Sequence, residues 1–212
     1  MKIGIFGTSG FATEVADVCD SLAIQDIVFI SSEVSSEGAA KNGIPVVSES
    51  KVPDLQKQGY EFAIGIANPQ IKEKISAKYT DLKFVNLIHP AASFGRNQRK
   101  ELDKCKGLVV GAGVRFMSNI KVGDFVCISL NATIGHDSVL ESYISIMPGA
   151  HISGNVVIKS KAYIGSGAVV LQGNDSQKLI LGGSLKVGAG AVVTQSFENE
   201  GTVVGVPAAK IK

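Results

Sequence analysis

Large apolar residues recur at every sixth position through the second half of the chain. Eleven of them keep one unbroken register: Val110, Phe116, Val122, Ile128, Ile134, Leu140, Ile146, Ile152, Ile158, Ile164 and Val170. This period differs from the 3.6 of a helix and from the alternation of a half-buried strand. It is typical of hexapeptide repeats, in which three short strands make one triangular coil and stacked coils bury a continuous core. We therefore predict a left-handed parallel β-helix, all β, over residues 107–212.

The register is interrupted once, by the polar segment 172–178. The apolar leads resume at Leu181, Val187 and Val193, so the gap corresponds to one hexad with five inserted residues. Polar, glycine-containing insertions in solenoids project as loops. We expect such a loop here, and the sequence assigns it no role. Residues 204–210 leave the repeat and are expected to cap the last coil.

The first part of the chain alternates strand and helix patterns. Apolar runs predict strands at 3–6, 27–30, 46–47 and 62–66, and helical spacing of apolar residues predicts helices over 11–23 and 70–79. This alternation is typical of a small parallel sheet covered by helices. We therefore predict an α/β, Rossmann-like N-terminal domain over residues 1–88.

The first strand leads into the first helix through Gly7-Thr8-Ser9-Gly10. Backbone N–H groups at such a turn, together with the helix dipole, can hold a phosphate. The turn lacks the full dinucleotide-binding glycine pattern, and the second strand ends in Ser31-Ser32 instead of an acidic residue. The pattern indicates a phosphorylated or nucleotide-bearing ligand other than a nicotinamide cofactor, with a purely structural turn as the alternative.

Charge and cysteine content narrow the classes of partner. Residues 89–106 form a basic linker without interleaved aromatic residues, and the net charge of +2 gives no general attraction to nucleic acid or anionic membranes. The first apolar run ends at Gly7, too early for a signal peptide or membrane span. Cys19, Cys105 and Cys127 are widely spaced, which indicates neither a disulfide framework nor a zinc site. We expect a cytoplasmic protein without membrane insertion or nucleic-acid binding.

The candidate chemistry centres on His136. It lies two positions after the lead Ile134, so its ring should stand outside the coil, and Asp137 can orient that ring. One coil takes eighteen residues, so Gly154 stacks over His136 at a spacing of about 4.8 Å and would let an acyl group approach a backbone N–H. Asn119 and Asn155 flank Asp137. A base, its carboxylate partner and an oxyanion donor are the parts that acyl transfer requires.

The other two histidines carry less weight. His89 precedes a proline at the domain junction, and His151 lies on another part of the coil from His136. A zinc site built from the three histidines is the alternative, but their spacing does not converge on one point. We therefore expect no metal.

Taken in order, four short motifs give the whole chain a family resemblance. They are Gly7-Thr8-Ser9-Gly10, Asn86-Leu87-Ile88-His89-Pro90, Gly135-His136-Asp137 and Gly205-Val206-Pro207-Ala208. With these motifs the chain resembles the PglD/NeuD-type sugar acyltransferases of bacterial glycan biosynthesis. The resemblance implies that the N-terminal domain holds a nucleotide-linked sugar and that the β-helix forms a homotrimer. It also implies that acetyl-CoA lies between neighbouring subunits.

The resemblance also assigns residues by position. It implies His136 as the catalytic base, Asp137 as its partner and Gly154 as the residue facing the thioester. It implies a substrate site at Ser9, Gly10, Phe11, Ser31, Ser32 and Gly65, and acetyl-CoA contacts near Ser145, Ser166 and Ala189. The chain departs from some relatives in having Ser31-Ser32 instead of acidic residues, Ser145 instead of a histidine, and Asp137 instead of a glutamate.

These observations predict an acetyl-CoA-dependent N-acetyltransferase. The acceptor would be the amine of a UDP-, dTDP- or GDP-linked amino-deoxysugar, used for a bacterial surface glycan or glycoprotein. One alternative is O-acetylation of a sugar of the sialic acid type, which the same geometry would serve. A second alternative is a non-catalytic nucleotide-sugar-binding protein that keeps the solenoid.

Overall fold

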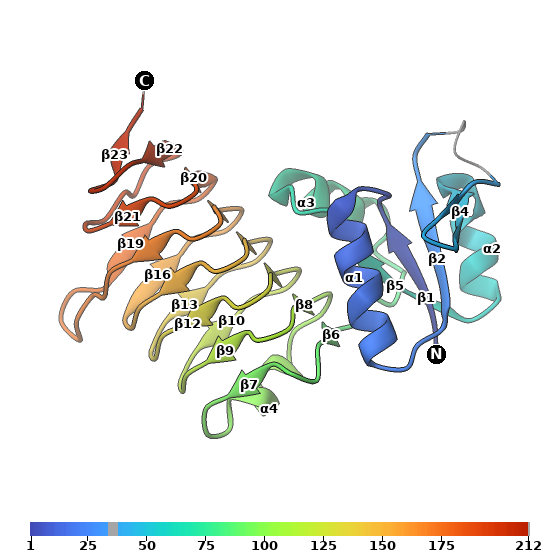
Figure 1. The fold of residues 1–212 in the computed structure, drawn as a ribbon, viewed down its shortest axis with the longest axis horizontal. Helices are drawn as coiled ribbons and strands as arrows, with labels where there is room; N and C mark the ends of the chain where they lie inside the picture. Colours follow the sequence, from blue (N-terminus) through green and yellow to red (C-terminus); the bar gives the residue numbers. More distant parts are fainter. Residues whose placement is uncertain (34–37, 212) are drawn as a thin grey trace.

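The structure is a computed structural model that describes residues 1–33 and 38–211. An α/β domain at the N-terminus lies beside a stack of β-coils, and the C-terminus lies at the far end of that stack (Figure 1). In the described residues no helix is long and apolar enough to cross a membrane. The two parts are the Rossmann-like domain and the β-helix that the sequence predicts.

The N-terminal sheet has the strand order β3-β4-β2-β1-β5 and is parallel apart from the β3–β4 pair. Its strands are β1 (Lys2–Phe6), β2 (Asp26–Ser31), β3 (Ala40–Lys41), β4 (Ile44–Ser48) and β5 (Tyr60–Ile64). The helical segments are α1 (Gly10–Ser21), η2 (Glu49–Lys51), α2 (Val52–Lys57) and α3 (Pro69–Lys78). The sequence pattern located each major element and missed β3, η2 and α2, which are short or weakly apolar.

Close packing of α1 on the sheet explains two sequence features of this domain. The apolar residues of β1 and the inner face of α1 are buried together, as at Ile5 and Val15. At Gly65, directly after β5, an added Cβ would lie 2.7 Å from the Cα of Ala12 and 2.7 Å from Ile5 Cγ2. Glycine is therefore needed where the strand end meets the helix.

The β-helix has three faces, each made of short strands stacked one coil above another. The eight-strand face contains β6 (Leu87–Ile88), β8 (Val109–Val110), β11 (Cys127–Ile128), β14 (Ser145–Ile146), β17 (Tyr163–Ile164), β20 (Leu185–Val187), β22 (Gly201–Val204) and β23 (Ala209–Lys210). The six-strand face contains β7 (Ser93–Phe94), β9 (Arg115–Phe116), β12 (Thr133–Ile134), β15 (His151–Ile152), β18 (Val169–Val170) and β21 (Val192–Val193). The four-strand face contains β10 (Lys121–Val122), β13 (Val139–Leu140), β16 (Val156–Ile158) and β19 (Leu179–Leu181).

The predicted register agrees with the observed pairing. Ile134 pairs with Ile152, eighteen residues later, and both leads are buried in one continuous apolar core. Each lead stacks on the lead of the next coil, so the period of six becomes a column of apolar side chains along the axis. The antiparallel β22–β23 pair ends the stack, in the segment expected to cap it.

Stacking begins earlier in the chain than residue 107. Strand β6 pairs with β8 and β7 pairs with β9, so residues 87–94 already form part of the first coil. The short helix α4 (Gln98–Leu102) follows, and Gln98 lies buried with its amide bonded to the backbone of Ile120. The segment expected to be a solvated linker is therefore partly built into the β-helix.

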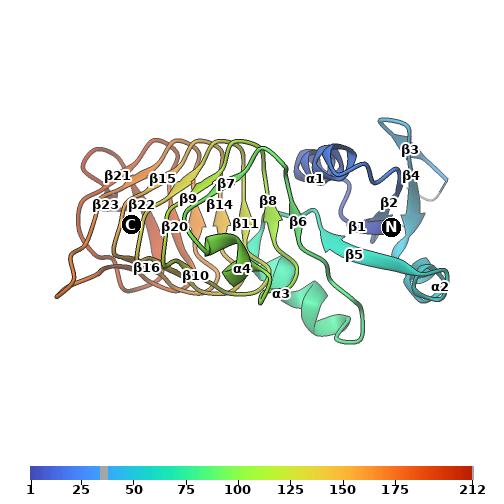
Figure 2. The same cartoon turned by 90° about the horizontal axis from the view of Figure 1, so that it is seen from below.

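The N-terminal domain contacts the eight-strand face through α3 (Figure 2). Lys72 of α3 is 2% exposed, and its ammonium donates to the carbonyl of Ile144 at 2.9 Å and contacts Cys127 Sγ at 3.4 Å. The hydroxyl of Ser145 donates to the carbonyl of Ala67 at 2.6 Å. These contacts fix the N-terminal domain against the middle coils.

Candidate active site

His136 stands at a corner of the β-helix, in the turn that follows β12. The Asp137 backbone has φ of 57°, a left-handed conformation, and its N–H donates to the carbonyl of Ser118 one coil below at 3.2 Å. The Asn155 N–H donates to the carbonyl of His136 from the coil above at 2.9 Å. Side chains at this corner point outward, and His136 is exposed as the hexad position predicts. We call the turn residues Ser118, His136 and Gly154 the His136 corner.

Asp137 holds the imidazole by a short hydrogen bond. His136 Nδ1 lies 2.7 Å from Asp137 Oδ2, and the amide of Asn119 donates to Asp137 Oδ1 at 3.2 Å. The bond from His136, followed by the one from Asn119, lowers the pKa of the Asp137 carboxyl, and the charge of Lys178 adds to this. An ionised carboxylate can only accept, so in the neutral imidazole the proton lies on Nδ1 and the lone pair on Nε2.

Gly154 is needed because the imidazole ring lies against it. An added Cβ at Gly154 would be 2.6 Å from both Nε2 and Cε1 of His136. Contacts shorter than 3.0 Å force a neighbour to move, and here the neighbour is the ring. Glycine at this position therefore leaves the space in which the His136 ring lies. The sequence predicted a different reason for this glycine, the approach of an acyl group to its backbone N–H.

The insertion 172–178 lies next to this corner. The Gly173 N–H donates to the carbonyl of Gly154 at 3.1 Å, and Asn155 Nδ2 donates to Asp175 Oδ1 at 3.3 Å. Lys178 Nζ donates to the carbonyl of Asp137 at 2.6 Å. The sequence did not indicate Lys178. Its side chain crosses from one coil to another, and the hexad register does not predict contacts of that kind.

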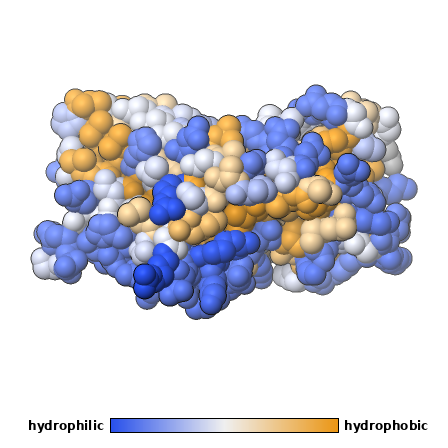
Figure 3. Space-filling model, turned by 60° about the horizontal axis from the view of Figure 1, so that its bottom comes forward, coloured by the Kyte–Doolittle hydropathy of each residue, from blue (hydrophilic) through white to orange (hydrophobic). Residues whose placement is uncertain are grey.

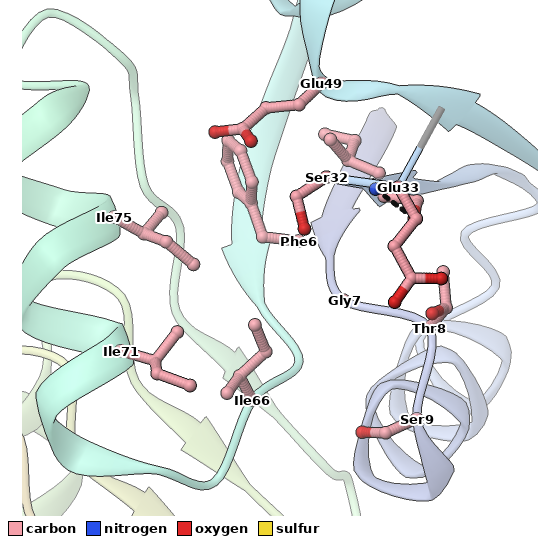
Figure 4. A pocket seen from close by; sticks show the side chains of 12 residues that line it. Phe6, Gly7, Thr8, Ser9, Ser32, Glu33, Glu49, Ile66, Ile71 and Ile75 are labelled. Atoms are coloured by element: carbon pink, nitrogen blue, oxygen red, sulfur yellow. Dashed lines mark hydrogen bonds between the residues drawn. The ribbon is translucent and has the colours of Figure 1, made fainter. Parts of the chain in front are cut away.

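A second candidate site is a pocket of about 400 Å³ in the N-terminal domain, at the carboxyl ends of β1 and β2 (Figure 4). Polar groups line one side of this pocket. Isoleucines from α3 and from the loop before α3 line the other side. The lining residues are Phe6, Gly7, Thr8, Ser9, Ile30, Ser31, Ser32, Glu33, Glu49, Ile66, Ile71 and Ile75. The carboxyl ends of parallel strands are where open α/β sheets bind ligands.

The predicted substrate residues divide between this pocket and its surroundings. Ser9, Ser31 and Ser32 line it. Gly10 and Phe11 lie in the first turn of α1 outside the lining, and Phe11 contacts a small cavity against β8 and β11. Gly65 is buried behind the pocket, where its carbonyl oxygen lies 3.0 Å from the Cβ that an alanine would add at Gly7.

Two acidic residues of the pocket were missed. Glu33 lies two positions beyond the end of β2, and its N–H donates to Ser31 Oγ at 3.0 Å. Glu49 accepts from the Tyr79 hydroxyl at 2.9 Å and from Lys78 at 3.0 Å. The position of Glu33 just after an apolar strand was a usable signal in the sequence. Glu49 was not predictable, since its position in the pocket depends on how η2 folds back toward the sheet.

The predicted acetyl-CoA contacts fall at two different places. Ser166 and Ala189 are exposed and stack at the corner that precedes the six-strand face, where the Gly190 N–H donates to the carbonyl of Ser166 at 2.8 Å. We call this column, which also contains Leu130 and Pro148, the Ser166 corner. Ser145 is 0% exposed at the domain junction, so no surface of it is available to a ligand, and we leave it out of the proposed site.

One chain does not bring these two corners together. The His136 corner and the Ser166 corner are the two edges of the six-strand face, so the width of that face separates them. Among the residues that the structure describes there is also no group of histidine, cysteine or carboxylate side chains that could hold a metal.

Fold and site together define the class as a hexapeptide-repeat acetyltransferase with an N-terminal α/β domain. The PglD N-terminal domain model matches residues 2–79. GDP-perosamine N-acetyltransferase of Escherichia coli O157:H7 is 31% identical over 220 residues, which cover 99% of this chain and 96% of that protein. The chain therefore belongs to the PglD/NeuD-type family of sugar acyltransferases.

Solved structures agree over the full length. WeeI from Acinetobacter baumannii AYE is 30% identical with a TM-score of 0.86 and covers 100% of both chains. The acetyltransferase domain of PglB from Neisseria gonorrhoeae FA1090, in complex with acetyl coenzyme A, is 27% identical with a TM-score of 0.86, covering 99% of this chain and 98% of that one. PerB from Caulobacter crescentus, in complex with CoA and GDP-perosamine, is 26% identical with a TM-score of 0.86, covering 100% and 98%.

Proposed function

We propose that this protein transfers the acetyl group of acetyl-CoA to the amine of a nucleotide-linked amino-deoxysugar. Relatives that match the whole chain support this proposal, since one is named for N-acetylation of GDP-perosamine and another binds CoA with GDP-perosamine. A GDP-linked sugar is accordingly the first acceptor to test, and UDP- and dTDP-linked sugars follow. Use of acetyl-CoA and a nucleotide sugar would put the reaction in the cytoplasm, on a route to a bacterial glycan.

The observation that carries the proposal is the His136–Asp137 pair. Its 2.7 Å bond uses Nδ1 and leaves Nε2 as the basic nitrogen, on a ring that stands at the surface of the β-helix. A general base needs an available lone pair and a fixed direction, and a placed base is worth about 10²- to 10⁴-fold in rate. Asp137 provides the direction and stabilises the imidazolium that forms.

The proposed reaction is a direct transfer without an acyl-enzyme. The sugar amine attacks the thioester carbonyl, and Nε2 of His136 takes the proton that the amine loses as the C–N bond forms. The tetrahedral intermediate then expels the CoA sulfur, which receives that proton from the imidazolium as the C–S bond breaks. The backbone N–H of Gly154 is the proposed donor to the oxyanion, because Gly154 is the residue that lies against the His136 ring on the coil above.

The pocket of the N-terminal domain is the proposed site for the nucleotide. Its isoleucine wall from the α3 side, which includes Ile71, suits the flat face of a base. The hydroxyls of Ser31 and Ser32 and the carboxylate of Glu33 can bond sugar hydroxyls. Its volume of about 400 Å³ falls in the range of small-molecule sites.

A homotrimer would complete the acetyl-CoA site. Exposed apolar side chains lie at both edges of the six-strand face, with Met117 and Leu171 beside the His136 corner and Leu130 at the Ser166 corner. Figure 3 shows hydrophobic patches on the face of the molecule that it draws, over both the β-helix and the N-terminal domain. If three six-strand faces surround one axis, each His136 corner meets a neighbour's Ser166 corner, and the ring closes. Patches of this kind mark protein interfaces.

The test measures CoA release from acetyl-CoA with GDP-, UDP- and dTDP-linked amino sugars and with sialic acid. We expect turnover with one nucleotide-linked amino sugar in the wild type and loss of turnover in His136→Ala, with His89→Ala, outside the six-strand face, as the matched control. Turnover with sialic acid alone would favour the O-acetyltransferase. Binding of acetyl-CoA without turnover on any acceptor would favour a non-catalytic binding protein. Unchanged activity in His136→Ala would contradict the proposed site.

A further inference from the structure

The insertion 172–178 is anchored to the active corner at both of its ends. Gly173 bonds to the carbonyl of Gly154, and the Leu179 N–H donates to the carbonyl of Asn155 at 3.1 Å. Between these ends Asn174 Oδ1 accepts from the N–H groups of Ser176 and Gln177 at 3.1 and 2.8 Å. The loop is thus held internally and fixed on the coil that carries Gly154.

Lys178 reaches from this loop to the base pair itself. The strand register aligns Val156 with Leu179, so Lys178 begins one coil above Asn155 and two coils above Asp137. Its half-buried side chain crosses the level of Asn155, and its ammonium donates to the Asp137 carbonyl at 2.6 Å. This contact joins three successive coils at the corner where His136 stands.

Asp137 is then held by contacts of three kinds. Its two carboxylate oxygens bond to His136 and Asn119, and its carbonyl accepts from Lys178. Among the described residues no backbone N–H donates to the Asp137 carbonyl, so the ammonium of Lys178 fixes that peptide plane. Because Lys178 binds the carbonyl, it leaves both carboxylate oxygens to their partners and adds a positive charge that favours the ionised form.

We propose that Lys178 is a positioning residue, which holds the Asp137 peptide so that the carboxylate keeps the imidazole of His136 in its reactive orientation. The inference rests on the proposed function of the His136–Asp137 pair. The proposal gives the insertion a role, because the loop places the Lys178 ammonium where it can donate to the Asp137 carbonyl. Small errors in the placement of a base cost large factors in rate, and a misplacement of about 1 Å can cost about 10²-fold.

The experiment compares wild type, Lys178→Met and Lys178→Arg, with Gln177→Ala as the control from the same loop. We expect kcat to fall roughly 10-fold or more in Lys178→Met while KM for both substrates stays within about 2-fold, since the contact positions the base and not the ligand. Lys178→Arg should restore most of kcat, because a guanidinium can still donate to the carbonyl. Gln177→Ala should behave as wild type.

A second readout does not depend on turnover. In protein labelled with ¹⁵N-histidine, the His136 ring resonances, assigned by their loss in His136→Ala, should shift in Lys178→Met and return in Lys178→Arg. Unchanged resonances with unchanged kcat would overturn the proposal, and a rise in KM alone would assign Lys178 to ligand binding instead. If the wild type acetylated no acceptor, the proposed function would fail, and the resonances would still decide the role of Lys178.

Discussion

The two ring nitrogens of His136 have different neighbours, and this difference gives the residue its chemistry. Nδ1 faces the Asp137 carboxylate and Nε2 lies against Gly154 on the next coil. The sequence indicated both neighbours, because adjacency places Asp137 and the eighteen-residue coil places Gly154. It did not indicate Lys178, whose contact depends on the path of an irregular loop and not on the repeat.

Asp137→Asn tests the carboxylate. The amide can still accept from Nδ1, but it supplies no negative charge to stabilise an imidazolium, so we expect kcat to fall by about 10²-fold. KM for acetyl-CoA should change little, because Asp137 faces His136 and not a ligand. Steady-state kinetics on both proteins measure this, and equal kcat values would exclude a role for the charge.

The lowered pKa of Asp137 predicts how stability depends on pH. Its hydrogen bond to His136 is the main cause, so the folded carboxyl titrates below the unfolded value of about 3.9. The stabilisation is complete above that unfolded value and is lost as the pH falls through the folded pKa. Wild type should therefore lose stability relative to Asp137→Asn only in acid. Thermal unfolding across the acid range measures this, and a stability difference between the two proteins that stayed constant as the pH fell would contradict the assignment.

Gly154→Ala tests the space around the ring. The new methyl group would lie 2.6 Å from Nε2, so the ring must rotate away from its bond with Asp137. We expect kcat to fall by about 10²-fold with the trimer and the fold retained. Gly183→Ala is a control for solubility and assembly, because an added Cβ there would meet only the Ser160 carbonyl oxygen at 3.4 Å and the position lies away from both corners. Full activity in Gly154→Ala would mean that the ring is not held as described.

At the scale of elements, the repeat was predictable and the junction was not. A period of six determines which side chains face inward, and so gives the coils, the stacking and the outward direction of His136. The contacts of α3 with the eight-strand face bury Lys72 and Ser145, and no local pattern marks a lysine that will be covered by another domain. The family resemblance implied an acetyl-CoA contact near Ser145, and no local pattern indicated that Ser145 would instead be buried at the junction, where it bonds to Ala67.

Lys72 gives this junction a pH dependence. Burial lowers the pKa of its ammonium, whereas the unfolded chain titrates at about 10.4. Between the two values the unfolded state binds more protons, so stability rises with pH through that window. In Lys72→Met this rise should disappear, while exposed Lys74→Met should keep it. Urea midpoints over the neutral to alkaline range measure the slope, and parallel curves for all three proteins would contradict the assignment.

At the scale of the molecule, the account depends on assembly. The two corners proposed to contact acetyl-CoA lie on opposite edges of one face, and exposed apolar residues border that face at both edges. The sequence alone could place each corner in a hexad. It could not place one corner against the other, because that contact requires a second chain. Only the family resemblance implied such a contact.

Leu130→Glu tests this arrangement. Leu130 is 41% exposed at the Ser166 corner, and a carboxylate there would have to be buried against a neighbour without a partner. We expect sedimentation velocity to show a trimer for wild type and smaller species for Leu130→Glu, with activity lost together with assembly. Lys186→Glu, on the eight-strand face, should remain a trimer. A monomeric wild type with full activity would contradict the shared site.

The central claim is that an amine receives the acetyl group. The most direct measurement is ¹³C NMR of the product formed from [1-¹³C]acetyl-CoA and a GDP-linked amino-deoxysugar whose amine carries ¹⁵N. The account predicts an acetamide carbonyl coupled to the sugar nitrogen, formed by wild type and absent with His136→Ala. An acetyl ester on a sugar hydroxyl, or labelled acetate without any acetylated sugar, would contradict it.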